Sequence, residues 1–436
     1  MTFGKTLRVA VPRSSHGRWT PGPNRRNTES LLTENAQGRL GDLIPLRNSR
    51  MAESPFAFFR GSAIVMAADL ATTPSSGLRV QACGDAHCMN FGGFATPERN
   101  LIFDVNDFDE TLAGAWEWDL KRLVTSIVLA GRQNGFKERD SRIAAIAALQ
   151  SYRVRLNDLA KQPTLNAWYA RLDATKILDQ ARDEASRTRR NTIANEAATA
   201  SVVAAVERFT EIVDGKRRFK DEPPLLFHSS ATDHHGFDVE EIFANYASTL
   251  RDDVRSLYDR YRLVDHAIKV VGVGSVGTRC AIGLFESHDN HAIILQVKQA
   301  VRSVIEPYFA PSSYINQGER VVQGQRLMQA ASDVFLGWAT SGTNHFYIRQ
   351  FKDMKASADI EKADKYDLRE YAHYCAWALA AGHARSGDAA AISGYIGKSD
   401  VFDKAVLAFA ALYADQAECD HSEFIRKIKE GEIASE

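Results

Sequence analysis

The stretch at residues 267–298 constrains the fold most, because its glycine-rich loop lies between two strand patterns. Apolar runs at 267–271 and 280–286 flank the loop, and a third run at 292–297 follows a short turn. The loop at 272–277 reads G-x-G-x-x-G, a spacing that dinucleotide-binding folds also use. Those folds require a helix directly after the glycines and an acidic residue about 20 positions further on. The sequence therefore predicts a three-stranded meander whose loop amides cover phosphate groups.

Lys298 ends the third strand of this meander. A glycine-rich hairpin that covers phosphates, with a lysine on the third strand, is the arrangement of protein kinases. A solvated strand end is the alternative interpretation of this lysine. Kinases pair the lysine with a helical glutamate, and the candidates here are Glu306 and Glu319. Spacing does not decide between these two, and Glu306 is included in the predicted site.

An acidic stretch earlier in the chain, CGDAHCMNFGGFATPERNLIFDVNDFDE, carries the residue types that phosphoryl transfer needs. In that reaction one carboxylate orients the acceptor hydroxyl, while an amide oxygen and another carboxylate hold Mg²⁺ against the nucleotide phosphates. Asp85 and Asn90 are five positions apart, and Asp107 begins an Asp-Phe pair after the strand pattern at 101–105. A strand pattern at 78–82 also precedes Asp85, so both carboxylates are expected at strand ends.

Several short motifs carry a resemblance to known families. Five of them resemble the bacterial domain of unknown function 2252 family, and the likeness runs along most of the chain: SPFAFFRGSA, CGDAHCMNFG, FDVNDFDE, WEWDLKRL and GHARSGD. A more distant resemblance is to the aminoglycoside and choline kinase group, whose catalytic loop reads His-Gly-Asp-x-His-x-x-Asn. The corresponding run here is CGDAHCMN at 83–90, with cysteine in place of the first histidine.

The second resemblance implies a role for each matching residue. Asp85 would be the catalytic base, and Asn90 and Asp107 would hold Mg²⁺. Asp119, in the first turn of a core helix predicted over 116–131, would brace the loop. The implied cofactors are ATP and Mg²⁺, and the ATP site would consist of Gly272, Gly274, Ser275, Gly277, Lys298 and Glu306. The acceptor would be a hydroxyl of a small molecule, which no residue pattern identifies, and nucleotidyl transfer is an open alternative.

The order of these motifs differs from that of ordinary kinases, because the glycine loop and lysine follow the catalytic loop. A circular permutation reconciles the two orders, since connections can be rewired where termini lie close together. The predicted fold is therefore α+β and protein-kinase-like, with two lobes and a circular permutation. Its parts are a mainly helical region with an N-terminal arm at 1–262, a β-rich nucleotide-binding lobe at 263–355, and C-terminal helices at 356–436. The helix at 365–386 is expected to pack beside the catalytic loop.

Other functions remain open at this stage. A nucleotide-binding regulator without turnover, a pseudokinase, would keep the ATP site. A metal-dependent hydrolase would gather four side chains around one or two ions, and it predicts a glycine loop far from them: Asp85, His87, Asp107 and Asp109. Turn-capping polar residues are the simplest alternative for the acidic stretch. Cys83 and Cys88 permit zinc, but a fourth ligand is missing and buried thiols are favoured.

Arginines in the first 60 residues are a further place where phosphate could bind. The arm is expected to lie over the body of the protein, and four of its arginines are expected in solvent or against an acidic surface: Arg13, Arg18, Arg25 and Arg26. Arg60, at the end of a buried helix pattern that starts at Ser54, is expected in a phosphate contact or an internal salt bridge.

Composition bears on partners and compartment. The 54 basic and 55 acidic side chains leave a formal charge of -1, so bulk charge favours neither nucleic acid nor membrane as a partner. Five scattered cysteines fit reduced thiols better than a disulfide framework. No signal sequence is recognised, and no apolar run approaches the roughly 18 residues of a membrane helix. The chain is predicted to be soluble and cytoplasmic, and its oligomeric state is undetermined.

Overall fold

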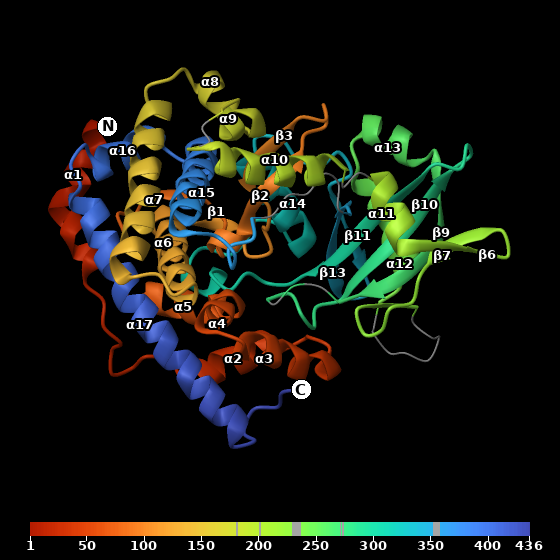
Figure 1. Ribbon diagram of the computed structural model, residues 1–436, viewed down its shortest axis with the longest axis horizontal. Helices are drawn as coiled ribbons and strands as arrows, with labels where there is room; N and C mark the ends of the chain where they lie inside the picture. The colour runs from red at the N-terminus through yellow and green to blue at the C-terminus, as the bar shows by residue number, and fades with distance from the viewer. Residues whose placement is uncertain (180–181, 200–201, 229–236, 271, 273, 352–357) are drawn as a thin grey trace.

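A computed structural model describes residues 1–179, 182–199, 202–228, 237–270, 272, 274–351 and 358–436. The His-rich run HSSATDHHG at 228–236, which the sequence predicts as a surface loop, lies outside these residues except for its first position. A helical region gathers on one side of the molecule and a large antiparallel sheet on the other (Figure 1). The fold is mixed α+β, as predicted.

The large sheet contains the predicted meander. Its strands are β8 (Leu226–Phe227), β9 (Tyr261–Lys269), β10 (Cys280–Ser287), β11 (Ala292–Ala300), β12 (Gly337–Ser341) and β13 (Asn344–Gln350). They are arranged in the order β12-β13-β11-β10-β9-β8, with every neighbouring pair antiparallel. The strands β9, β10 and β11 are consecutive neighbours, and the glycine loop connects the first two. The predicted meander is therefore confirmed, whereas β12 has no counterpart in the prediction.

Both faces of this sheet are buried, which explains why its strands are apolar in both alternating positions. On β10, Phe285 packs with residues of α12 (Val239–Tyr246) and α13 (Asp252–Tyr258). The neighbouring Leu284 packs instead with α11 (Val202–Phe209) and the hairpin of β6 (Thr210–Val213) and β7 (Lys216–Phe219). The two cores of the sheet thus include residues from Ala205 onward, well before residue 263.

The helical region surrounds α6 (Trp116–Gln133), which is buried along its length from Trp116 to Gly131. Around it pack α7 (Glu138–Leu159), α15 (Lys365–Ser386), α16 (Ala389–Ile396) and α17 (Val401–Lys429). The N-terminal segment adds α1 (Thr2–Ala10), η1 (Arg13–Gly17), α2 (Thr28–Ala36), η2 (Gly41–Leu43) and α3 (Ile44–Ala52). It passes along the edge of this region and below it in Figure 1.

Two predicted helices have different limits in the structure. The apolar run after Ser54 forms two helices, α4 (Pro55–Gly61) and α5 (Ala63–Leu70), because Ser62 has non-helical backbone angles of φ -119 and ψ 41. The sequence pattern of Arg320 to Phe335, with apolar residues on one broad face, predicts a helix there; the structure forms α14 (Gln317–Met328), which ends earlier. Just beyond this end, the Ala330 amide donates to the Asp104 carboxylate at 3.2 Å, outside any helix.

The remaining strands are short and belong to the region around the acidic stretch. They are β1 (Arg79–Ala82), β2 (Phe91–Ala95), β3 (Leu101–Val105), β4 (Leu112–Ala115) and β5 (Leu172–Asp173). The pairs β1 with β4 and β2 with β3 are antiparallel. The other short elements are η3 (Cys88–Asn90), α8 (Thr164–Trp168), α9 (Ala174–Asp179), α10 (Glu184–Thr199), η4 (Ala247–Thr249) and η5 (Glu306–Tyr308).

Candidate functional site

Two connecting segments, 83–90 and 106–111, run side by side between the two small antiparallel pairs. The chain leaves β1 through the first segment, turns through β2 and β3, and returns to β4 through the second. The Asn106 amide donates to the Asn90 carbonyl at 3.0 Å, where the second segment begins. Asp85 and Asn90 are therefore held next to Asp107 by the pairing of the flanking strands.

Gly84 marks the closest approach of these segments. Its φ is +80, a conformation that L side chains rarely adopt. A Cβ atom at this position would lie 2.3 Å from the Glu110 carbonyl oxygen. Glycine is therefore required at position 84 for both backbone conformation and space.

Asp119 braces the first segment from below. Its carboxylate accepts the Cys83 amide at 2.6 Å and the Gly84 amide at 2.9 Å. His383 Nε2 lies 3.1 Å from the same carboxylate, and His383 Nδ1 lies 2.7 Å from the Tyr152 hydroxyl. All three side chains are buried. The chain of hydrogen bonds links α6, α7 and α15 to the acidic stretch, and His383 has a structural position.

The helix α15 packs beside the predicted catalytic loop, as expected for residues 365–386. The Tyr371 hydroxyl lies 2.8 Å from the Cys88 carbonyl and 2.9 Å from the Phe91 carbonyl. Near the other end of the helix, His383 contacts Asp119, which in turn accepts the loop amides of Cys83 and Gly84. A C-terminal helix thus supports a loop formed by residues near position 85.

Asp85 is held by the buried Arg122, whose Nε donates to Asp85 Oδ1. Burial raises the pKa of Asp85 above its usual value, although the charge and hydrogen bond of Arg122 lower it. The other oxygen, Oδ2, lies 3.9 Å from His87 Nε2. The Asn90 amide nitrogen donates to the Asp85 main-chain carbonyl at 2.7 Å. The oxygen of the Asn90 amide is then the atom that remains for a cation.

Lys298 makes an ion pair with Asp109 rather than with either predicted glutamate. Its Nζ lies 2.9 Å from Asp109 Oδ2, and the Tyr347 hydroxyl donates to Asp109 Oδ1 at 2.6 Å. Burial disfavours the charged ammonium, but Asp109, Tyr347 and Asp107 together outweigh it and raise the pKa of Lys298 well above its usual value. Lys298 is therefore a buried cation bound to the acidic stretch.

The prediction that Glu306 or Glu319 pairs with Lys298 is thus wrong. Glu306 lies in the short helix η5 and forms an ion pair with Arg302 at 3.2 Å. Glu319 lies in the first turn of α14, where its amide donates to Asn316. The physical reason is that β11 packs against the 106–111 segment. This packing brings the Asp109 carboxylate within ion-pair distance of Lys298.

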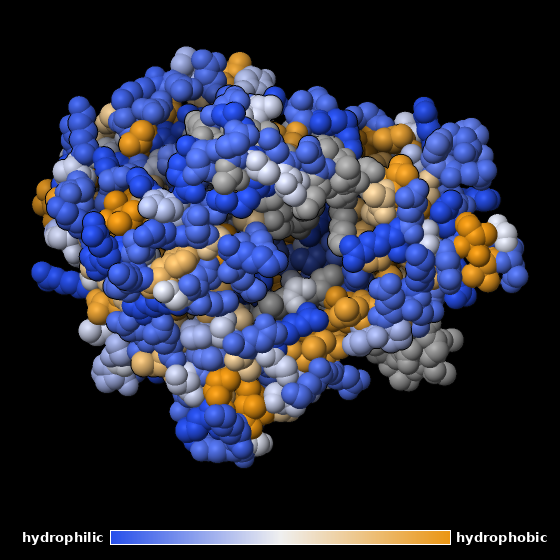
Figure 2. Space-filling view, in the orientation of Figure 1, coloured by the Kyte–Doolittle hydropathy of each residue, from blue (hydrophilic) through white to orange (hydrophobic). Residues whose placement is uncertain are grey.

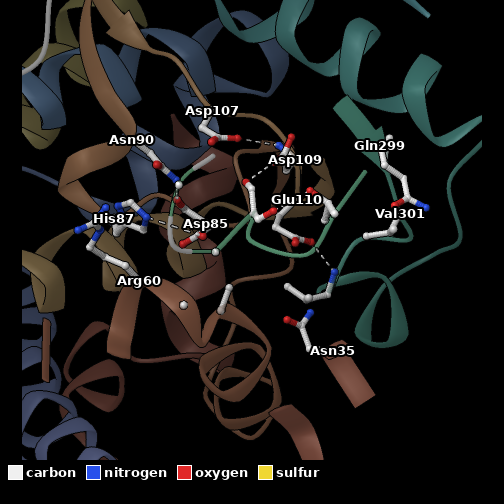
Figure 3. A pocket seen from close by; sticks show the side chains of 18 of the residues that line it. Asn35, Arg60, Asp85, His87, Asn90, Asp107, Asp109, Glu110, Gln299 and Val301 are labelled. Carbon is white, nitrogen blue, oxygen red and sulfur yellow. Dashed lines mark hydrogen bonds and ion pairs between the residues drawn. The ribbon is translucent and has the colours of Figure 1, made fainter. Parts of the chain in front are cut away.

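A cleft of about 140 Å³ brings part of the predicted site together. Its lining includes Asp85, Asn90 and Asp107 together with the loop residues Gly272, Gly274 and Ser275 (Figure 3). The Ser275 hydroxyl donates to Asp109 Oδ2 at 3.3 Å. The hydrolase interpretation required a glycine loop distant from the acidic cluster, and that expectation is wrong.

Lys298 opens into a second cleft of about 560 Å³ that adjoins the first. Asp107, Gly272 and Ser275 line both clefts, so they form the boundary between them. Figure 2 shows a hollow near the middle of one face of the molecule, with hydrophilic residues in its depth. Of the predicted ATP-site residues, Gly277 and Glu306 are absent from the described lining of both clefts.

The N-terminal arm holds the glycine loop through arginines that the sequence prediction missed. Arg39 donates to the carbonyls of Gly274 at 2.8 Å and Val276 at 2.6 Å. Arg50 donates to the Gly272 carbonyl, and the Gly277 carbonyl accepts the Leu40 amide at 2.7 Å. The signal that could have found these contacts is weak, because arginines are frequent throughout the arm.

Two arginines of the arm lie against acidic side chains, as expected. Arg25 forms ion pairs with Asp69 at 2.9 Å and Asp420 at 2.6 Å. Arg26 pairs with Glu34 at 2.6 Å. Neither is among the described lining residues of the two clefts.

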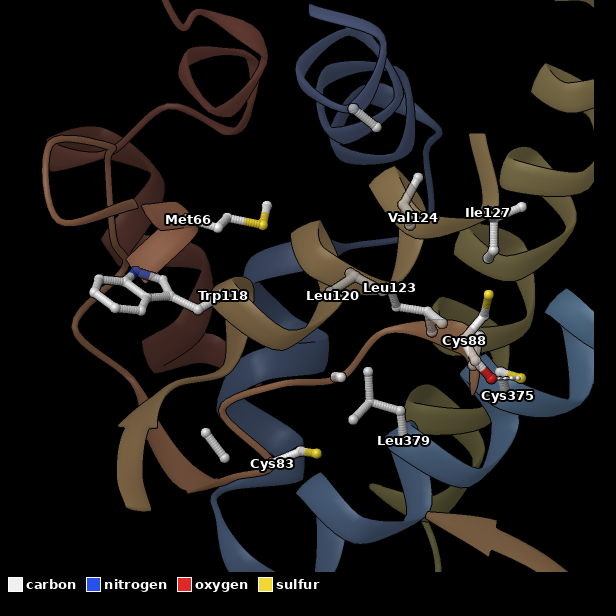
Figure 4. Close-up of a cluster of buried hydrophobic side chains, with 14 of the residues drawn as sticks. Met66, Cys83, Cys88, Trp118, Leu120, Leu123, Val124, Ile127, Cys375 and Leu379 are labelled. Atoms are coloured by element: carbon white, nitrogen blue, oxygen red, sulfur yellow. Dashed lines mark hydrogen bonds between the residues drawn. The ribbon is translucent and has the colours of Figure 1, made fainter. Parts of the chain in front are cut away.

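The cysteines near the site are core residues. Cys83 and Cys88 are fully buried among apolar side chains of α6 and α15 (Figure 4). Burial raises the pKa of the Cys88 thiol to about 11, so this group stays protonated at neutral pH. In the part of the chain that the structure describes, no group of three or more His, Cys, Asp or Glu side chains could hold a metal ion.

The fold and the two clefts define an α+β protein with a charged site between a sheet and a helical region. A sequence profile of one family matches residues 39–427. The chain therefore belongs to the family described as "Uncharacterized protein conserved in bacteria (DUF2252)". No curated protein and no solved structure matches the chain significantly. Among the described helices, none is both long and apolar enough to cross a membrane.

Proposed function

We propose that the protein is an ATP- and Mg²⁺-dependent phosphotransferase with a circularly permuted, kinase-like arrangement. The observation that carries the proposal is the shared cleft of the acidic segments and the glycine loop. Asp85, Asn90 and Asp107 meet Gly272 and Ser275 there, although the two sets are far apart in sequence. The position of α15 beside the loop supports the permuted order, because a C-terminal helix occupies the place expected for one that precedes the loop in ordinary kinases.

Two oxygen-bearing side chains of the smaller cleft fit Mg²⁺. This ion prefers carboxylate and carbonyl oxygens and is usually bound by one or two protein ligands plus substrate phosphates. Asn90 offers its amide oxygen, and Asp107 offers its carboxylate. The main chain of Asp109 donates to Asp107 Oδ1 at 3.2 Å, which orients that carboxylate.

The larger cleft has the size and charge for a nucleotide. Its volume of about 560 Å³ lies within the roughly 300–1,000 Å³ of small-molecule sites. Lys269 and Arg349 line it and provide positive charge toward phosphates, beside Lys298 with its partner Asp109. Gly272 has a φ of +73, as a glycine loop in close contact with a ligand allows. In this proposal the phosphates lie at the boundary formed by Gly272 and Ser275.

Asp85 has the environment of a base for the acceptor hydroxyl. Arg122 holds Oδ1, which leaves Oδ2 as the oxygen that accepts the proton. The raised pKa of Asp85 increases its basicity relative to an exposed aspartate. When bound, Mg-ATP supplies the phosphoryl group and the metal charge that neutralises the transferring oxygens.

The contact between Arg122 and Asp85 also favours a second candidate, a nucleotide-binding regulator. A cation held against the base stabilises its ionised form and reduces its tendency to take a proton. The two candidates share the ATP site and differ in turnover. The same variants can therefore separate them.

The test uses Mg-ATP binding and ATP turnover of the wild type, Asp85→Asn and Asp107→Ala. The phosphotransferase predicts binding with Asp85→Asn but at least about a hundredfold loss of turnover, whereas Asp107→Ala weakens both. A regulator predicts binding without turnover in the wild type. ATP labelled in the γ-phosphate or in the α-phosphate separates the two reactions. Phosphoryl transfer moves the γ-label to the acceptor, whereas nucleotidyl transfer moves the α-label. Full activity of both variants would refute the assignment.

A further inference from the structure

The smaller cleft contains a cation that forms no hydrogen bond or ion pair with a described carboxylate. Arg60 lines this cleft beside Asp85 and His87 (Figure 3). Its Nε atom is buried and has no hydrogen-bond partner within the described part of the chain. No ion pair to Arg60 is found there either. The guanidinium carbon of Arg60 lies 5.8 Å from the centroid of the Phe56 ring. Arg60 as a whole is only partly buried, and a guanidinium that lines a cleft without a bound carboxylate can form charged hydrogen bonds to an anionic ligand.

The other charged groups of the cleft are already matched. Asp85 pairs with Arg122, and Asp109 pairs with Lys298. Arg39 is satisfied by main-chain carbonyls of the glycine loop. Asp107 is the carboxylate that the proposed function assigns to Mg²⁺. Arg60 is the charge that remains for the ligand.

Glu110 does not supply the missing anion. Its carboxylate accepts the Val304 amide at 2.7 Å, and burial raises its pKa to about 7. The group is thus substantially protonated near neutral pH and already has a partner.

His87 provides a second binding group next to Arg60. Its side chain is 6% exposed, and its Nδ1 atom is buried with no hydrogen-bond partner among the described residues. Both unsatisfied nitrogens thus belong to residues that line the same end of the cleft as Asp85. An anionic group placed between them would satisfy Arg60 and could also bind His87.

The size of the cleft limits what can enter. Its volume is about 140 Å³, close to the cavity of about 150 Å³ that holds one benzene molecule. A compound of several sugar rings is larger than this space. The part of the acceptor next to Asp85 must therefore be small.

We propose that the acceptor is a small hydroxy compound with an anionic group, either a carboxylate or a phosphate, bound by Arg60 and His87. This inference rests on the proposed phosphotransferase function. The acceptor oxygen forms the new bond to the γ-phosphorus of ATP as the bond from that phosphorus to the β,γ-bridging oxygen breaks. Asp85 takes the hydroxyl proton, and ADP leaves. Arg60 and His87 orient the acceptor for this step.

The experiment measures binding by calorimetry to the full-length chain saturated with Mg²⁺ and a non-hydrolysable ATP analogue. The probes are glycerate and glycerol 3-phosphate as anions, glycerol as the neutral compound, and kanamycin as a cationic polyhydroxyl compound. At least one anion should bind, and at least about tenfold more tightly than glycerol or kanamycin, because a charged hydrogen bond is involved. The two anions separate a carboxylate ligand from a phosphate ligand.

Three variants assign the binding to Arg60. Arg60→Gln should weaken the bound anion at least about tenfold while the affinity for the ATP analogue stays within about twofold. Arg60→Lys keeps the charge and should show a smaller loss. Arg26→Gln is the matched control, because this arginine is 47% exposed and pairs with Glu34 away from the cleft; it should bind as the wild type does.

The proposal is overturned if neither anion binds, if glycerol or kanamycin binds as tightly, or if the anion affinity survives Arg60→Gln. It is also overturned if Arg60→Gln weakens the ATP analogue as much as the anion, since Arg60 would then bind nucleotide phosphate. Failure of the ATP analogue to bind the wild type would instead contradict the phosphotransferase function. The two failures are therefore distinguishable.

Discussion

Lys298 Nζ lies 2.9 Å from Asp109 Oδ2, although 189 positions separate the two residues. The contact joins strand β11 of the large sheet to the acidic segment of the helical region. The Lys298 side chain is 4% exposed and that of Asp109 is 30% exposed. Water therefore hardly reaches the lysine ammonium if the contact is broken. Tyr347 on β13 adds a hydrogen bond to the same carboxylate. This group of three residues fixes the position of the sheet relative to Asp107.

Breaking this ion pair should destabilise the protein. We expect Lys298→Met to lower the free energy of unfolding by about 2 kcal/mol, because Asp109 loses a partner in a mostly buried position. Asp109→Asn should cost a similar amount, and the double variant should cost clearly less than both together. Urea unfolding of the four proteins gives the coupling energy. Additive effects would show that the contact does not stabilise the fold.

Gly84→Ala should be far more damaging than Gly77→Ala. Both glycines have a φ of +80, but a Cβ at position 77 meets nothing within 4 Å, whereas one at position 84 meets the Glu110 carbonyl at 2.3 Å. The conformational cost of about 1 kcal/mol is common to both. The difference in melting temperature between the two variants therefore reports only the close approach of the two segments. Equal melting temperatures would contradict that approach.

Asp119→Asn should loosen the loop that carries Asp85. The carboxylate accepts two main-chain amides and contacts His383, and an asparagine oxygen replaces only part of this. We expect a loss of about 2 kcal/mol in unfolding free energy, with faster amide hydrogen exchange at Cys83 and Gly84. Asp415→Asn is the control, because this side chain is 63% exposed and pairs with Arg132. Unchanged exchange in Asp119→Asn would refute the bracing role.

Glu110 should make stability depend on pH. Burial raises its folded-state pKa from 4.5 to about 7. Between these two pH values the folded state therefore holds a proton that the unfolded state releases. The contribution of this proton to the folding stability is fully present below pH 4.5 and is lost as the pH rises through 7. Glu110→Gln keeps an acceptor for Val304 and cannot ionise. Its melting temperature should fall less than that of the wild type between pH 5 and pH 8, and parallel profiles would contradict the shift.

The predictable part of the fold depended on local patterns. Alternation and glycine spacing predicted the meander of β9, β10 and β11, and the helical period predicted α6. Ser62 was missed as a break because the apolar run continues on both sides of it. The strand β12 was missed because Gly337–Ser341 is short and holds two small polar residues.

The candidate site was predictable where residues are neighbours in sequence. Asp85, Asn90 and Asp107 were identified from their spacing, and the hairpin of β2 and β3 explains why they lie together. Arg39 was not assigned to the cleft, and Arg60 was predicted only as a phosphate contact or an internal salt bridge, because a single sequence does not distinguish an arginine that faces a cleft from one in solvent. Lys298 was identified, but its partner was not.

The sequence alone determined many of the strands and helices and several of the polar residues at their ends, because these depend on neighbours along the chain. Only the tertiary structure decided that Lys298 pairs with Asp109 instead of Glu306, and that the glycine loop of the sheet shares a cleft with Asp85. Such pairings depend on how β11 packs against a segment distant in sequence. A carboxylate becomes a partner when packing brings it within reach and removes water from the contact.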